Sequence, residues 1–138
     1  MADSGELSCI KIFENHSVVL DQTLVPNEVK YFDILNNEDA WLAIRDMKVR
    51  GAPLIAVVAL QGLKASLKKE TNIHGDAPLI HEFLAKSSEY LKGSRPTAVN
   101  LANDLDDLVK SVKDITEPAQ LLEKIYAQIQ KNYDDYAD

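Results

Sequence analysis

One segment constrains the fold more than any other part of the sequence. Residues 53–60 read PLIAVVAL, the longest apolar stretch in a chain of 138 residues, and the stretch opens with a proline. Proline fits the first turn of a helix because the N–H that it lacks has no helical partner there. A helix that is apolar all round is buried on every side. We therefore expect a deeply buried helix from Pro53, too short in its apolar part for the roughly 20 residues of a membrane span.

The first third of the chain has a different period. Segments 9–13, 17–20 and 29–34 alternate apolar and polar residues or are rich in β-branched and aromatic residues, as strands are. Turn-forming residues separate them. Residues 1–35 are therefore predicted to form a small antiparallel meander of three strands.

Residues 36–138 carry a helical period and are predicted to form a bundle of about five helices, which makes the fold class α+β. The expected helix starts share a capping residue or a proline. In chain order they are Asn36 or Asn37, Pro53, Asp76 with Pro78, Pro96 with Thr97, and Thr116 with Pro118. Gly93 is expected to end the third helix in a left-handed conformation.

Two apolar patterns along these helices carry further expectations. Trp41, Ile44 and Met47 are spaced to share one face of the first helix. Tyr133 and Tyr136 extend the apolar stripe of the last helix with no stop signal after them. We therefore expect the chain to be the N-terminal part of a longer polypeptide.

Charge and cysteine usage exclude several classes of function. The chain has 22 acidic and 15 basic residues, a formal charge of -7, which repels a nucleic-acid backbone unless basic groups gather on one face. The basic cluster of Lys64, Lys68 and Lys69 is expected to be a solvated helix face, so no nucleic-acid partner is predicted. Cys9 is the single cysteine of the chain, so an intrachain disulfide is excluded, and it is expected to be an inert buried thiol. No secretory signal is evident, and we expect a cytoplasmic protein that also reaches the nucleus.

No arrangement of side chains predicts a metal site or a phosphate loop. The three histidines lack the ligand spacing of a zinc site and are expected to be solvated or locally bonded. Asp104, Asp106 and Asp107 are expected to lie on a solvated helix face. The five glycines form neither a Walker nor a Gly-x-Gly-x-x-Gly pattern.

One motif occurs twice. Residues 50–53 (RGAP) and 93–97 (GSRPT) each place an arginine directly ahead of a predicted proline-initiated helix. A helix start presents unpaired N–H groups, and a guanidinium adds donors that match phosphate oxygens. Gly51 lets a ligand approach the backbone closely. Facing one point, the two junctions would clamp an anion; alternatively, the glycines only cap helix ends and the prolines only begin helices.

Three segments carry a resemblance to a known family. Residues 20–26 (LDQTLVP), 47–53 (MKVRGAP) and 94–101 (SRPTAVNL) resemble the N-terminal domain of the methylthioribose-1-phosphate isomerase family, in the same order and spacing. The Arg-Gly-Ala and Arg-Pro-Thr-Ala-Val pieces also resemble ribose-1,5-bisphosphate isomerases and regulatory subunits of the translation initiation exchange factor. The Asp21-Gln22-Thr23 segment and Asn100 favour the methylthioribose branch.

The resemblance implies an enzyme of methionine salvage that converts 5-methylthioribose 1-phosphate into 5-methylthioribulose 1-phosphate without a cofactor. Arg50, Gly51 and Ala52 match the family's substrate-binding motif, and Arg95 matches its second substrate-contacting arginine. The family's catalytic cysteine and aspartate belong to a Rossmann-like C-terminal domain, beyond Asp138. The resemblance therefore implies that this chain has no catalytic residue, is inactive alone, pairs with that domain and takes part in a homodimer.

One departure and two alternatives accompany this interpretation. The family usually continues Arg-Gly-Ala-Pro-Ala-Ile-Gly, whereas Leu54 and Ala56 stand here, which is expected to alter packing inside the helix rather than binding. A regulatory exchange-factor subunit would bind without turnover. A self-contained helical interaction module would instead present an acidic tail to a basic partner, with Asp134, Asp135 and Asp138 as the charged groups.

Overall fold

The fold is described by a computed structural model for residues 9–137. Its strands are β1 (Ile10–Ile12), β2 (Ser17–Leu20) and β3 (Tyr31–Ile34). Its α-helices are α1 (Asn37–Arg45), α2 (Ala52–Lys69), α3 (Ala77–Lys92), α4 (Val99–Val112) and α5 (Pro118–Ala137), with a 3-10 turn at Thr71–Ile73. The strands pair antiparallel in the order β1-β2-β3. The predicted meander, the five helices after it and the α+β class are confirmed.

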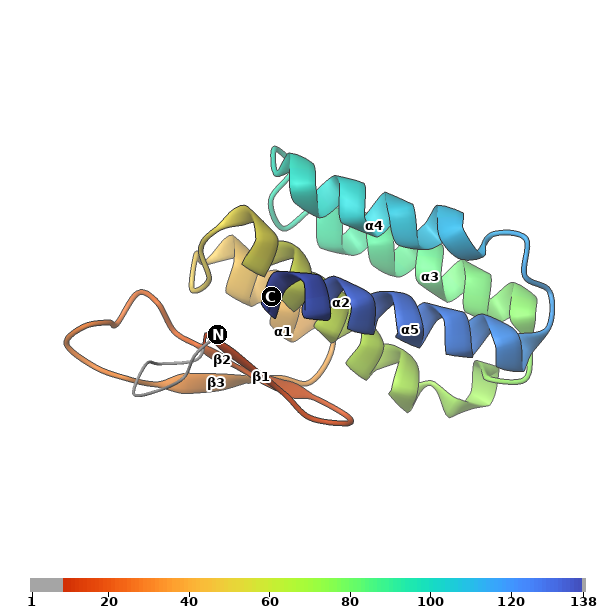
Figure 1. Ribbon diagram of the computed structural model, residues 1–138, viewed down its shortest axis with the longest axis horizontal. Coiled ribbons are helices and arrows are strands. Elements are labelled where there is room, and N and C mark those ends of the chain that lie inside the picture. The colour runs from red at the N-terminus through yellow and green to blue at the C-terminus, as the bar shows by residue number, and fades with distance from the viewer. Residues whose placement is uncertain (1–8, 138) are drawn as a thin grey trace.

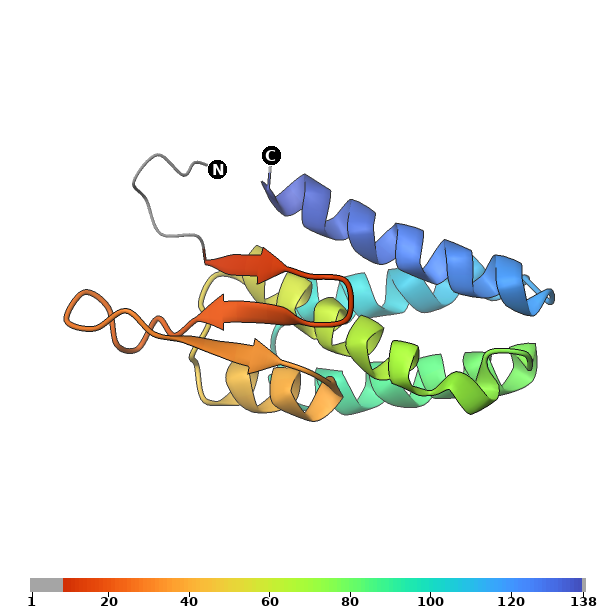
Figure 2. The ribbon, with the colours of Figure 1, turned by 90° about the horizontal axis from the view of Figure 1, so that it is seen from below.

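Helix α2 lies at the centre of the fold. It packs against α1, α4 and α5 and against strands β2 and β3. The sheet covers one side of the helices (Figure 1), with its three strands side by side in Figure 2. Every residue from 54 to 65 is buried. The apolar stretch predicted this burial for residues 54–60. Full burial of an aliphatic side chain contributes about 1.5–3 kcal/mol to stability. No helix in the described part of the chain is long and apolar enough to cross a membrane.

Helices α1 and α2 approach each other closely at Gly62. A Cβ on this residue would lie 2.6 Å from the Cβ of Ala40 and 3.0 Å from the carbonyl oxygen of Asn36. These distances are shorter than van der Waals contact, so no larger residue fits without displacing α1. Gly62 therefore sets the spacing of the two helices.

Two predictions about the connection between α3 and α4 are wrong. Gly93 has a φ of -67°, because residues 93–95 continue α3 with hydrogen bonds of 3.1 to 3.3 Å to carbonyls three residues back, which needs no positive φ. Helix α4 begins at Val99 and not at Pro96. A hydrogen bond of 3.0 Å closes residues 95–98 into a turn, and proline favours the second position of such a turn as much as a helix start.

The apolar pattern predicted the end of the last helix correctly and the end of the first helix incorrectly. Helix α1 ends at Arg45, and Met47 lies beyond it, 52% exposed with a φ of 60°. The prediction that Met47 shares a helix face with Trp41 and Ile44 is therefore wrong. In α5 the predicted stripe is confirmed: Leu121, Ile125 and Ile129 are buried, and Leu122, Tyr133 and Tyr136 pack against the core.

Candidate anion-binding site

The two arginine junctions lie at the same end of the helical bundle (Figure 1). One joins α1 to α2 through residues 46–51, and the other joins α3 to α4 through residues 93–98. The second junction contacts the helix that leads into the first, since Nη2 of Arg95 donates a hydrogen bond of 3.1 Å to the carbonyl oxygen of Ile44 in the last turn of α1. The negative end of a helix dipole favours a cation at this position. The fold thus brings together two motifs that are far apart in the sequence.

The first junction places unpaired backbone donors at the start of α2. Gly51 is the N-cap residue, with φ 88° and ψ 125°, and no side chain caps the helix. A Cβ on Gly51 would meet nothing within 4 Å, so glycine is required here by the backbone angle and not by a shortage of space. Arg50, Gly51 and Ala52 are all exposed. Among the described residues, the Arg50 guanidinium has no hydrogen-bond or ion-pair partner.

The N-termini of the α-helices differ in how they are capped. Three helices have a side-chain cap: Asn36 accepts from Asp39 N at 2.8 Å for α1, Asp76 from Leu79 N at 3.1 Å for α3, and Glu117 from Gln120 N at 3.1 Å for α5. Helices α2 and α4 have no side-chain cap and no acidic residue in the first turn. These two follow the arginine junctions. Uncapped N–H groups and the positive end of the helix dipole attract an anion.

Gln22 holds the first junction in place. Its Oε1 accepts a hydrogen bond of 2.6 Å from the backbone N–H of Arg50, and its own backbone N–H donates to the carbonyl oxygen of Lys48 at 2.9 Å. Its Nε2 lies 3.7 Å from the sulfur of Cys9. Sequence reasoning used Gln22 only as a family marker and missed this role. A contact between two loops leaves no periodic signal, so the Asp21-Gln22-Thr23 motif was the one feature that could have indicated it.

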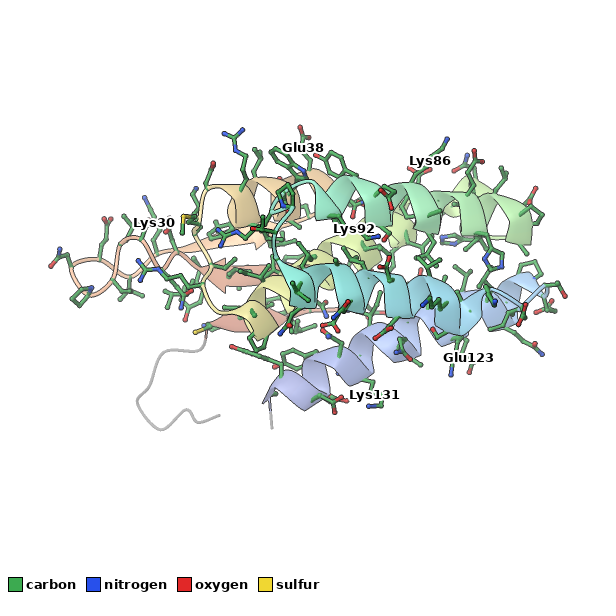
Figure 3. All side chains as sticks on the ribbon, turned by 90° about the horizontal axis from the view of Figure 1, so that it is seen from above. Lys30, Glu38, Lys86, Lys92, Glu123 and Lys131 are labelled. Atoms are coloured by element: carbon green, nitrogen blue, oxygen red, sulfur yellow. The ribbon has the colours of Figure 1, made fainter. Side chains whose placement is uncertain are left out.

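Arg95 lines a hollow of about 260 Å³ beside the start of α4, together with Glu89 and Lys92. Lys92 comes from α3, on the side that faces α4 in Figure 3, and pairs with Glu89 at 3.3 Å and with Asp106 at 2.5 Å. The hydrogen bond to Asp106, partly opposed by burial, raises the pKa of Lys92. Lys92 is thus matched by two carboxylates. Apart from the contact with Ile44, the guanidinium of Arg95 has no partner within residues 9–137 and keeps donors for a ligand.

Two expectations about other side chains need correction. Lys64 is buried, 9% exposed, and not part of a solvated face. Cys9 is only half-buried and stands just before β1. Each error has the same cause, because these environments depend on neighbouring elements that the local pattern does not contain.

His74 and His81 are each held by a hydrogen bond to a backbone carbonyl. His74 Nε2 is 2.7 Å from the carbonyl oxygen of Leu67, as expected for a locally bonded histidine. His81 Nε2 is 2.8 Å from the carbonyl oxygen of Ile115, which lies 34 residues away in the connection after α4, so its bond is not local. Within residues 9–137, no three His, Cys, Asp or Glu side chains are grouped so as to hold a metal ion.

Two further sets of acidic residues lie on α4 and near the end of α5. Burial, and next the charge of Asp107, raise the pKa of Asp104, which accepts a hydrogen bond of 3.2 Å from Asn132. Asp134 and Asp135 accept hydrogen bonds from side chains four residues earlier on α5. Asp138 lies outside the described residues. The acidic groups of α5 are thus partly engaged within their own helix.

Comparison with known proteins gives a consistent result. The profile of the initiation factor 2 subunit family matches residues 48–137. The chain is 38% identical to the methylthioribose-1-phosphate isomerase of Leishmania braziliensis over 127 residues, which are 89% of this chain and 34% of that protein. The chain therefore spans about a third of the length of the curated relatives that it matches.

Two solved structures resemble the fold. The crystal structure of 5-methylthioribose 1-phosphate isomerase from Pyrococcus horikoshii has a TM-score of 0.74 and 29% identity, and covers 92% of this chain and 36% of its own. Translation initiation factor eIF-2B, subunit delta, from A. fulgidus has a TM-score of 0.79 at 23% identity, covering 94% of this chain and 37% of its own. At that identity the second likeness shows the fold alone.

Proposed function

The chain belongs to the initiation factor 2 subunit family, and from this membership we propose that it forms the N-terminal, substrate-binding part of a methylthioribose-1-phosphate isomerase. The proposed reaction converts the aldose 5-methylthioribose 1-phosphate into the ketose 5-methylthioribulose 1-phosphate, without a cofactor. The 38% identity to an isomerase along 89% of the chain supports this assignment over a regulatory exchange-factor subunit, for which the family profile and a likeness of fold at 23% identity speak.

One observation carries the assignment of the site. The two helices without side-chain caps both follow an arginine, and Arg95 of the second junction is hydrogen-bonded to Ile44 at the end of α1, the helix that leads into the first junction. Backbone N–H groups at a helix start together with guanidinium donors suit a phosphate. We assign Arg50, the backbone of Gly51 and Ala52, and Arg95 to the substrate phosphate.

The proposed reaction gives these residues a clear task. A phosphate on the anomeric carbon blocks ordinary opening of the sugar ring. The enzyme must hold this phosphate while an acid group helps the ring oxygen to leave and hydrogen moves from C2 to C1. Orientation and fixed charge at a bound phosphate each lower the barrier by several kcal/mol.

The chemical step belongs, in this proposal, to the remainder of the complete protein. The acid group and the group that moves hydrogen would come from a Rossmann-like C-terminal domain, which would close the site opposite the two junctions and support a homodimer. Residues 1–138 alone would bind substrate weakly and turn none of it over. A cytoplasmic and nuclear location fits the proposed role in methionine salvage.

Steady-state kinetics of the complete protein test the proposal. Arg50→Met and Arg95→Met should each lower kcat/KM at least tenfold, about 1.4 kcal/mol of transition-state binding. Arg45→Met is the matched control, since Arg45 is an exposed arginine of α1 paired with Asp46, and it should leave the kinetics unchanged. Unchanged kinetics in Arg50→Met and Arg95→Met would overturn the site assignment. A folded complete protein with no turnover would overturn the isomerase and favour a regulatory role.

A further inference from the structure

Lys64 has an environment that the proposed isomerase site does not explain. It lies in the middle of α2, nine-tenths buried, and within residues 9–137 its ammonium has no hydrogen-bond acceptor and no carboxylate within 4.0 Å. Burial, and next the charge of Lys68, lower the pKa of Lys64, while Glu14 opposes them. Most of the Lys64 side chain is buried, whereas its Nζ reaches the surface at a pocket and keeps its donors for a ligand.

The side chain of Lys64 borders a pocket of about 480 Å³. The pocket lies between the turn that joins β1 to β2, helix α2 and helix α5, three segments that Figure 2 shows together. Its size is within the range of small-molecule sites. It shares no lining residue with the junctions of Arg50 and Arg95, so it is separate from the candidate phosphate site.

The lining of this pocket combines charge with apolar surface. Lys64 and Lys68, one helical turn apart, supply two ammonium groups, and Lys68 Nζ lies 5.0 Å from the ring centroid of Tyr126. Glu14 supplies a single carboxylate. The rest of the lining is mainly apolar or aromatic and comes from Ile12, Phe13, Tyr126 and Ala127, with Gln130 as a further polar group.

The charge balance selects the class of ligand. Two ammonium groups and one carboxylate leave one positive charge, which a single carboxylate of a ligand neutralises. A phosphate dianion would leave an excess of negative charge. We propose that this pocket binds an organic monocarboxylate with an apolar body, its carboxylate on Lys64 and Lys68 and its body against Phe13 and Tyr126.

Equilibrium dialysis of the complete protein with radiolabelled benzoate tests this site. Benzoate should bind saturably with one site per chain, and hexanoate should compete, whereas benzamide and inorganic phosphate should not. Lys64→Met and Lys68→Met should each weaken binding at least tenfold. Lys124→Met, which changes an exposed lysine of α5 outside the pocket, should bind benzoate as the wild type does.

Thermal denaturation separates loss of the site from loss of the fold. Without ligand, Lys64→Met should have a Tm equal to or above that of the wild type, because methionine keeps an apolar side chain of similar length and removes a partly desolvated charge. Benzoate should raise the Tm of the wild type and leave that of Lys64→Met unchanged. The proposal is overturned if benzoate shows no saturable binding at millimolar concentration, if benzamide or phosphate competes equally well, or if Lys64→Met binds as the wild type does.

Discussion

Replacing Gly51 by alanine isolates the contribution of one backbone angle to the site. Gly51 has a φ of 88°, in the range that L-residues rarely adopt, and nothing within 4 Å of an added Cβ. A clash is therefore excluded, and the substitution changes only backbone strain and the entropy of the unfolded chain. Gly75 is the matched control, because its Cβ would also meet nothing within 4 Å and its φ is outside the left-handed range.

The magnitude follows from the two terms. A non-glycine residue in a sparsely populated conformation costs about 1–3 kcal/mol, while Gly→Ala stabilises by about 0.4–1 kcal/mol through the unfolded state. Gly51→Ala should therefore lower the free energy of unfolding by about 1.3 kcal/mol at the midpoints of these ranges, and by about 2.6 kcal/mol at most. Gly75→Ala should raise it by about 0.4–1 kcal/mol. The difference between the two variants measures the strain alone.

Urea unfolding of both variants, followed by far-UV circular dichroism, gives these free energies. In the complete protein, Gly51→Ala should also raise KM, because relief of the strained angle redirects the N–H groups at the start of α2. Gly75→Ala should leave KM unchanged. Equal changes in unfolding free energy for the two variants would refute the argument, since it requires that only Gly51 be strained.

Three further predictions concern other parts of the structure. Gln22→Leu removes the acceptor of the Arg50 N–H, so it should destabilise the protein by about 0.5–1.5 kcal/mol and raise KM in steady-state assays. Gln22→Glu keeps the acceptor and should have the stability and KM of the wild type. If the glutamate variant behaves like the leucine variant, the positioning role is contradicted. Gly62→Ala should destabilise the protein by about 1–3 kcal/mol in urea unfolding, despite a helix-propensity gain of about 1 kcal/mol. Adding Ala40→Gly to this variant should recover part of the lost stability. A Gly62→Ala variant more stable than the wild type would show that α1 and α2 can move apart without cost. Burial raises the pKa of Asp104, so ionisation of this carboxyl opposes folding. Wild-type stability should therefore fall as pH rises from the unfolded-state pKa through the raised one. Asp104→Asn should be more stable at neutral pH and lose this part of the slope, and identical profiles of Tm against pH for the two proteins would contradict the raised pKa.

The sequence was most informative where one residue type has one physical meaning. A stretch that is apolar on all sides can only be buried, and α2 is. The stripe from Leu121 to Tyr136 has a single period, and α5 follows it to residue 137. Pro96 misled because proline suits both the first turn of a helix and the second position of a turn, and the hydrogen bond across residues 95–98 decides between them.

Features that arise between elements could not be predicted from local patterns. Lys64 occupies a polar position in the sequence, but β1, the turn after it and α5 lie beside it, and most of its side chain is buried. Gln22 contacts Arg50 only because the connection between β2 and β3 folds back onto the first junction. The location of the two arginine motifs at one end of the bundle likewise depends on helix order and not on either motif.

The close approach of α1 and α2 at Gly62 has a consequence for how a ligand would be received. The carbonyl oxygen that holds Arg95 belongs to α1, and the uncapped N-terminus beside Arg50 belongs to α2. With α1 fixed against α2, the spacing between the two halves of the candidate site is set before any ligand arrives. Preorganisation of this kind reduces the entropy lost on binding. The two junctions would then act together as a rigid template. Any closure around a substrate would be left to a part of the complete protein that faces them.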